Sequence, residues 1–118
     1  MNGFAANAGP KRYLRKWSLT EKLLHEVELT GTPDEGCWEF TGRRSGQRGY
    51  GQIWHQGHYH YVHRVSYEHY VGEIPEGLDI DHLCRNTACF RPDHLEAVTR
   101  SVNLLRGHEA RRREMANA

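Results

Sequence analysis

The residue types best suited to binding a metal and moving a proton are gathered between residues 81 and 103. Cys84, Cys89 and His94 follow one another at intervals of five residues, a spacing that suits a tight loop around a metal ion. His82 comes just before this loop, and Asn103 lies nine residues after His94. We interpret the two cysteines and His94 as part of a structural zinc site, and His82 with Asn103 as part of a hydrolytic site.

A fourth zinc ligand is expected from elsewhere in the chain, because structural zinc takes four thiolate or imidazole ligands in a closed tetrahedron. Cys37 is the remaining cysteine of the chain and is the expected fourth ligand. His58 or His60 is the substitute. The alternatives to a metal site are a disulfide between Cys84 and Cys89, or three buried thiols.

Composition also favours a bound metal. The chain has 118 residues, 37% of them hydrophobic, and its mean hydropathy is −0.83. A single domain of this size gains only modest stability from apolar burial, and small domains often add a metal. The net charge of +1 indicates no partner by itself. We see no secretory signal and no membrane-spanning apolar run, so a cytoplasmic, reducing location without a membrane partner is expected, where cysteines serve as thiolates.

The elements that position these residues begin with a helix. Residues 1–16 show no periodicity, and we expect a mobile basic arm there, followed by one domain over residues 17–118. Ser18 and Glu21 form the pattern of a capping box. Leu19, Leu23 and Val27 make the apolar stripe of a helix that ends near Gly31.

Short strands and two more helices should follow, which predicts an α+β fold. Strand-like stretches at residues 37–41, 50–54 and 59–62 predict a small antiparallel sheet. A helix is expected over residues 63–71, ended by Gly72. Two further strands are expected over residues 78–83 and 94–98, on either side of the cysteine loop. Thr99 is the expected cap of a final helix that carries Asn103.

The predicted sheet carries side chains that can contact nucleic acid. A strand ribbon with arginine and glutamine can lie in the major groove and contact base edges. An ordinary polar sheet face is the alternative, and the sheet becomes the best DNA-docking candidate only if the chain is a nuclease. The candidate DNA-binding residues are Arg43, Arg44, Arg48, Gln52, Trp54 and His55.

His82 and Asn103 suit phosphodiester hydrolysis. This reaction needs a water deprotonated in line with the phosphorus and a cation at the phosphate and leaving oxygen. A histidine suits the first need because its pKa lies near neutrality. A hard cation held by oxygen ligands suits the second. Five other histidines, at positions 55, 58, 60, 63 and 69, are expected to be exposed or hydrogen-bonded, without a catalytic role.

The string H-x-C-x4-C-x4-H-x8-N, formed by His82, Cys84, Cys89, His94 and Asn103, resembles the His-Cys box group of His-Me finger (HNH, ββα-metal) endonucleases. The upstream stretches E-G-C-W-E-F-T-G, G-Y-G-Q-I, H-R-V-S-Y-E and G-E-I-P-E-G-L resemble small HNH endonucleases of the kind found in phages and mobile introns. Together these motifs cover about residues 36–106.

The resemblance implies a zinc-stabilised ββα-metal core over about residues 78–113 and a role for each matched residue. His82 would be the general base. Asn103 would ligate one catalytic divalent ion, usually magnesium. Cys37, Cys84, Cys89 and His94 would hold structural zinc. Cleavage of double-stranded DNA would leave a 5′-phosphate and a 3′-hydroxyl.

The resemblance also bears on three further positions. Asp81 precedes the base and is expected as a second ligand of the divalent ion, with a salt-bridged acid as the alternative. Arg64 is our candidate for the arginine that steadies the leaving phosphate, with a packing role as the alternative. Arg91 departs from the family pattern, because relatives often carry asparagine at this position, where a residue could brace the loop.

The sequence also allows two rival functions. A zinc-organised DNA-binding module would need neither His82 nor Asn103. The second rival is a nuclease that acts on RNA or has no sequence preference. Parallel digestion of duplex DNA, single strands and RNA would distinguish it. Cutting both strands with one small site would normally require a homodimer.

Overall fold

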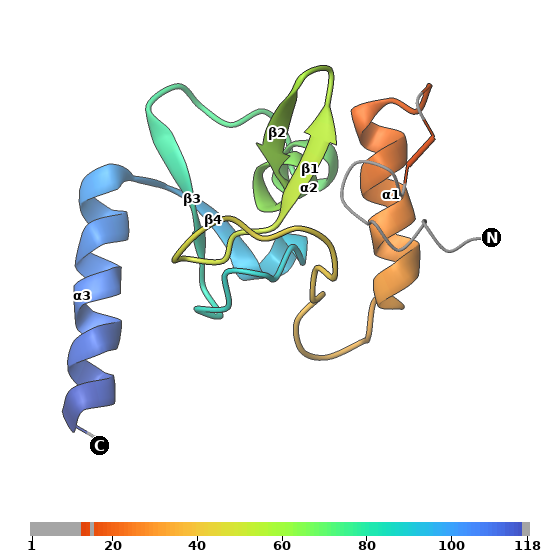
Figure 1. The fold of residues 1–118 in the computed structure, drawn as a ribbon. Helices are drawn as coiled ribbons and strands as arrows, with labels where there is room; N and C mark the ends of the chain where they lie inside the picture. The colour runs from red at the N-terminus through yellow and green to blue at the C-terminus, as the bar shows by residue number, and fades with distance from the viewer. Residues whose placement is uncertain (1–12, 15, 117–118) are drawn as a thin grey trace.

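The computed structural model describes residues 13–14 and 16–116, and its elements follow the order α1–β1–β2–α2–β3–β4–α3 (Figure 1). The helices are α1 (Leu19–Thr30), α2 (Val62–Tyr70) and α3 (Arg100–Ala116). The strands are β1 (Gln52–His55), β2 (His58–Tyr61), β3 (Leu78–His82) and β4 (Leu95–Thr99). A 3-10 turn, η3 (Pro92–His94), precedes β4. This is the α+β arrangement that the sequence predicted.

The sequence signals at the ends of α1 are confirmed. The Ser18 hydroxyl accepts a hydrogen bond from the Glu21 amide, and the Glu21 carboxylate accepts one from the Ser18 amide. Gly31 ends the helix with a φ of 75°, a left-handed conformation that glycine adopts without a steric penalty. Leu23 is fully buried on the inner side of α1.

The first sheet has two strands where three were expected, and the two strands on either side of the cysteine loop form a separate hairpin. β1 pairs with β2 through a turn at Gln56 and Gly57, both at positive φ, and β3 pairs with β4. The stretch 37–41 forms no strand and contributes a single bridge, Glu39 to Cys89. The prediction of a third strand there was therefore wrong.

The cause is that residues 37–41 pair with the cysteine loop. The Phe40 amide donates to the Ala88 carbonyl at 2.9 Å, and the Phe90 amide donates to the Trp38 carbonyl at 3.0 Å. Trp38 and Phe40 both pack edge-on against the Phe90 ring. This pairing occupies the backbone groups through which residues 37–41 would otherwise pair in a sheet. It also brings Cys37 toward the cysteines of the loop.

One core ties α1, β1 and α2 to the cysteine loop. Its buried members are Tyr13, Leu23, Phe40, Ile53, Val62, Val65 and Phe90. The Ser66 hydroxyl of α2 donates to the Phe90 carbonyl at 2.6 Å, which fixes the loop on the helix. Most of the predicted arm lies outside the described residues. Tyr13, however, is buried in this core, so packing begins before residue 17.

The last helix stands apart from that core. α3 begins where β4 ends, capped by the Thr99 hydroxyl, which accepts from the Val102 amide at 3.2 Å. None of its residues is buried, and it contacts the β3–β4 hairpin through its first turns (Figure 1). The strand–loop–strand–helix unit expected over residues 78–113 is therefore present, with Asn103 on its helix. No helix in the described part of the chain is long and apolar enough to cross a membrane.

Candidate metal centre and active site

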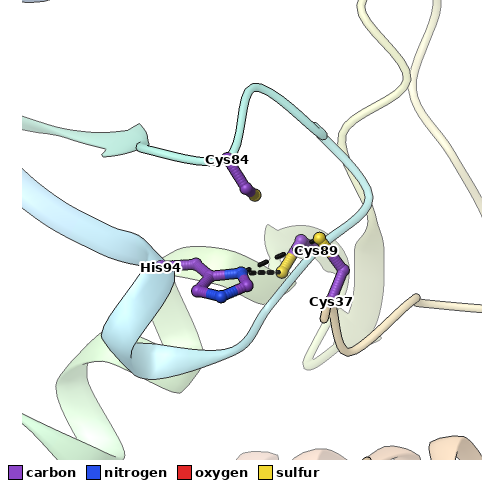
Figure 2. A group of neighbouring side chains, drawn as sticks. All are labelled: Cys37, Cys84, Cys89 and His94. Carbon is purple, nitrogen blue, oxygen red and sulfur yellow. Dashed lines mark hydrogen bonds between the residues drawn. The ribbon is translucent and has the colours of Figure 1, made fainter. Parts of the chain in front are cut away.

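Three cysteines and a histidine meet at the loop end of the β3–β4 hairpin (Figure 2). Cys37, Cys84, Cys89 and His94 each present one potential ligand atom, and these atoms all lie within 4.8 Å of one another. The His94 Nδ1 atom lies 3.7 Å from the Cys37 sulfur and 3.5 Å from the Cys89 sulfur. Neither His58 nor His60, the substitutes considered for the fourth ligand, belongs to the group.

The geometry and chemistry of this group fit zinc. In a tetrahedral site with ordinary zinc–sulfur and zinc–nitrogen bonds, sulfur and nitrogen ligands lie about 3.6 Å apart. The two measured separations, 3.5 and 3.7 Å, agree with that value. Burial raises the pKa of Cys89 to about 12 and also raises the pKa of Cys84, so burial favours the neutral thiols, and a bound cation would favour the thiolates. All three cysteines are free thiols.

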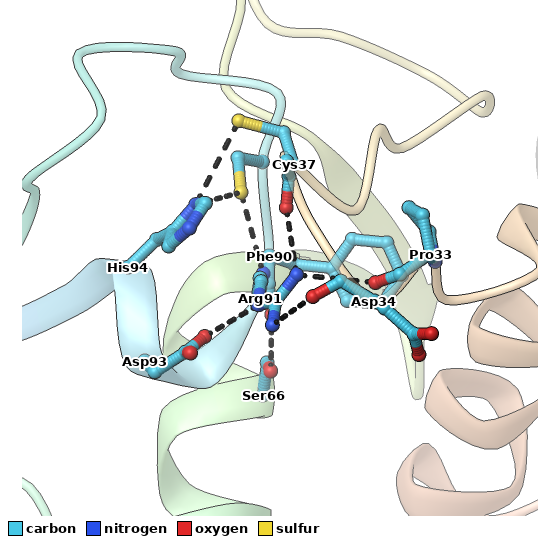
Figure 3. Close-up of polar contacts among 10 residues, drawn as sticks. Pro33, Asp34, Cys37, Ser66, Phe90, Arg91, Asp93 and His94 are labelled. Atoms are coloured by element: carbon cyan, nitrogen blue, oxygen red, sulfur yellow. Dashed lines mark hydrogen bonds and ion pairs between the residues drawn. The ribbon is translucent and has the colours of Figure 1, made fainter.

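Arg91 holds the distant Cys37 segment against the loop (Figure 3). Its guanidinium donates to the backbone carbonyls of Pro33, Asp34 and Gly36 at 2.9–3.1 Å and to the Asp93 carboxylate at 2.7 Å. The Arg91 amide lies 3.5 Å from the Cys89 sulfur. The arginine therefore braces the loop at the position where relatives were expected to carry asparagine.

His82 is oriented by the same loop. It is buried at the end of β3, and its Nε2 atom lies 3.1 Å from the carbonyl oxygen of Cys89. A carbonyl can only accept, so Nε2 carries the proton and the lone pair is on Nδ1. Burial is the largest influence on the ring and lowers its pKa, so burial favours the neutral form, which has a lone pair free to accept a proton. The backbone carbonyl of a residue in the metal cluster thus sets the tautomer of the candidate base.

His82 and Asn103 line one cavity of about 90 Å³ between the β3 end, the cysteine loop and α3. The two residues that the sequence predicted to converge therefore lie on the wall of the same cavity. The cavity wall also includes Tyr50, whose ring stacks on His82 with centroids 5.7 Å apart. The complete lining is Arg48, Tyr50, Ile80, Asp81, His82, Arg85, Thr87, Asn103, Leu104, Gly107 and Arg111.

Asp81 reaches the cavity but is held by arginines. It is 4% exposed and forms ion pairs with Arg85 at 3.1 Å and Arg106 at 3.2 Å, one through each carboxylate oxygen. Arg106 also bonds Glu96 at 2.7 Å. This is the salt-bridged arrangement that was the alternative to metal ligation, and ligation by Asp81 stays a prediction.

Arg64, the candidate phosphate arginine, is not among the residues that line the cavity. The arginines that line it are Arg48, Arg85 and Arg111. His63, one residue before Arg64, was expected to be exposed or hydrogen-bonded. It is buried, its ring centroid lies 4.6 Å from that of His82, and its Nδ1 atom has no hydrogen-bond partner among the described residues. Its place beside the base was missed because sequence spacing does not show how α2 packs on β3.

The predicted DNA-binding residues divide into two groups. Arg43 and Gln52 bond each other across the start of β1, Arg44 pairs with Glu39, and Arg48 reaches the cavity. Trp54 and His55 instead lie beside α1, where the Lys22 ammonium contacts the Trp54 carbonyl at 2.8 Å and His55 Nδ1 at 3.2 Å. Of the six predicted residues, Arg48 is the one that lines the cavity.

One segment of the chain matches a known protein family. Residues 60–105 match the family model of the HNH endonuclease. That segment belongs to the HNH endonuclease family. The HNH segment contains His82, Cys84, Cys89, His94 and Asn103, whereas Cys37 lies outside it.

Small phage proteins resemble a larger part of the chain than the HNH segment. Protein 2.8 of Escherichia phage T7 is 36% identical over 87 residues, which are 72% of this chain and 56% of that protein. Protein 7.7 of the same phage is 33% identical over 86 residues, covering 70% and 65%. The uncharacterized gene 5.3 protein of Enterobacteria phage T3 is 32% identical over 50 residues, covering 42% and 50%.

The chain thus spans about half to two thirds of the length of these relatives. No solved structure matches it.

Proposed function

We propose that this chain is a metal-dependent endonuclease that hydrolyses phosphodiester bonds in double-stranded DNA, of the small phage or homing-like HNH type. The observation that carries the proposal is that His82, fixed by the Cys89 carbonyl, shares one cavity with Asn103. The HNH match of residues 60–105 supports the same reaction class.

In this proposal His82 is the general base. Its Nδ1 atom accepts a proton from water as the water oxygen attacks the phosphorus of a phosphodiester in the cavity. The bond between phosphorus and the 3′-oxygen breaks, and the 3′-oxygen takes a proton from solvent. The products are a 5′-phosphate and a 3′-hydroxyl, as the family resemblance implied.

The cation sites have separate tasks. Asn103 would hold a divalent ion, magnesium in this proposal, which when bound supplies positive charge at the phosphate and the leaving oxygen. Asp81 could join Asn103 only after releasing an arginine. Cys37, Cys84, Cys89 and His94 would hold zinc, whose bonds stabilise the loop and therefore the position of the Cys89 carbonyl.

DNA would approach the face that holds the cavity. Arg48 on the cavity wall supports docking there, and the Arg43–Gln52 pair at the start of β1 would add contacts if the duplex extended along the β1–β2 hairpin. Arg44 lies next to this pair, while Trp54 and His55 would contribute only if the duplex extended toward α1. We also propose that two copies of the chain act together, one on each strand of the duplex. Sedimentation of the protein with and without duplex DNA tests this.

The test uses zinc-loaded protein and supercoiled plasmid in magnesium, with duplex DNA, single-stranded DNA and RNA compared in parallel. Cleavage of duplex DNA is expected from the unsubstituted chain and is abolished in His82→Ala, while DNA binding is retained. The matched control is His69→Ala, because His69 is an exposed histidine on α2. Asn103→Ala should require more magnesium and turn over more slowly. Binding without cleavage would instead identify a DNA-binding module.

A further inference from the structure

The arginines around Asp81 are not equivalent. Arg106 bonds both Asp81 and Glu96, so it has two carboxylate partners, and it lines only the neighbouring pocket along α3. Arg85 bonds Asp81 alone among the hydrogen bonds described for its side chain, and it lines both that pocket and the His82 cavity. Its side chain is 44% exposed. Arg85 is therefore the arginine that can leave Asp81 for a ligand beside His82.

The backbone of Arg85 points to a functional constraint. Its φ is 62°, in the left-handed region that is costly for a residue with a long side chain and that glycine or asparagine would adopt more readily. The loop enforces this conformation, because the Arg85 amide donates to the His82 carbonyl at 3.1 Å and Cys84 belongs to the metal group. The candidate base and Arg85 are thus positioned by the same turn.

Exchange of partners is electrostatically feasible. A guanidinium binds a carboxylate or a phosphate through the same planar pair of N–H groups. If Arg85 turned to a phosphate, Asp81 would still be paired with Arg106 and would not become a buried, unpaired charge. The other cavity arginines, Arg48 and Arg111, add positive charge, and Asp81 is the single carboxylate in the described lining.

We infer that Arg85 is a catalytic residue of the nuclease reaction proposed above: it releases Asp81 and contacts the scissile phosphate, while Arg106 keeps Asp81 paired. Arg85 thereby takes the role that the sequence suggested for Arg64. Asp81 serves to place Arg85 before the substrate arrives. Since this inference rests on the proposed function, its test must separate the two.

The test compares Arg85→Gln and Arg85→Lys with the unsubstituted chain under single-turnover conditions at saturating DNA in magnesium. Arg85→Gln should lower the cleavage rate about 100-fold or more, as removal of a group that stabilises transition-state charge does. Its DNA dissociation constant, zinc content and melting temperature should stay close to those of the parent, and Arg85→Lys should be intermediate. Arg100→Gln is the matched control, because Arg100 is 80% exposed and pairs weakly with Asp79 at 3.7 Å.

Two further readouts exclude other roles. Ethylguanidinium should restore part of the cleavage rate to Arg85→Ala and none to His82→Ala. The affinity for Mn²⁺ in the absence of DNA should not change in Arg85→Gln. Tighter Mn²⁺ binding would identify Asp81 as an ion ligand that Arg85 blocks, and would overturn the inference.

The remaining outcomes are decisive as well. A parental rate in Arg85→Gln, or a loss of rate explained by lost zinc or a lowered melting temperature, overturns the role of Arg85 and leaves the nuclease proposal standing. Failure of the zinc-loaded unsubstituted chain to cleave any nucleic acid overturns both.

Discussion

Replacement of His63 by phenylalanine should make the chain more resistant to mild acid. His63 is buried in α2 beside His82, and burial, followed by the charges of His82 and Arg64, lowers its pKa from 6.5 to about 3. The unfolded chain gains a proton on this ring below pH 6.5, while the folded chain does not. Because His63 Nδ1 has no hydrogen-bond partner among the described residues, phenylalanine removes no such contact.

The magnitude follows from proton linkage. Stability is lost as pH falls wherever the unfolded state binds more protons, which for His63 is the window from about 6.5 down to about 3. Between about pH 7 and pH 5.5 this histidine should remove about 1.2 kcal/mol of unfolding free energy. His63→Phe should lose about that much less than the parent over the same interval.

Urea unfolding at these two pH values, with zinc in excess, measures the difference. The pH dependence of zinc binding is common to both proteins and cancels in the comparison. His69→Gln is the control, because His69 is exposed on the same helix, and it should behave like the parent. Equal losses in His63→Phe and the parent would show that the folded chain accommodates a proton on His63, and would refute the reasoning that His63 is buried in its neutral form beside His82.

Three other substitutions or conditions test separate parts of the structure. Gly51→Ala would place a methyl group 2.6 Å from the Phe40 ring and should destabilise the chain by about 1–3 kcal/mol in urea unfolding; parental stability would show that the core can yield there. Arg91→Gln should cost about 1–3 kcal/mol and speed zinc transfer to a chelator, whereas Arg100→Gln should do neither. Because burial lowers the pKa of His82, the cleavage rate should hold as pH falls toward 6.5 and decline only below it; a decline centred above 6.5 would contradict the role of His82.

Local signals predicted the elements well because their causes are local. The Ser18–Glu21 capping box, the Gly31 stop and the Thr99 cap each act within one turn of helix, and all three are present. The spacing of Cys84, Cys89 and His94 likewise predicted a closed loop, and Cys37 joins them.

Several contacts between distant segments could not be predicted from the sequence. Residues 37–41 have strand-like composition, yet they pair with the cysteine loop and not with β1. Nothing in the spacing of His63 or Tyr50 indicated that their rings lie against His82. Asp81 could be placed next to the base by sequence, but its two arginine partners come from the loop and from α3.

The central claim is that a metal-bound loop fixes His82 as a base opposite Asn103 at a scissile phosphodiester. The most direct measurement is the single-turnover cleavage of duplex DNA in magnesium by the zinc-loaded chain and by zinc-loaded His82→Ala. The account predicts cleavage by the first and a rate lower by at least about 100-fold in the second, with zinc content and DNA affinity unchanged. Equal rates in the two proteins would contradict it.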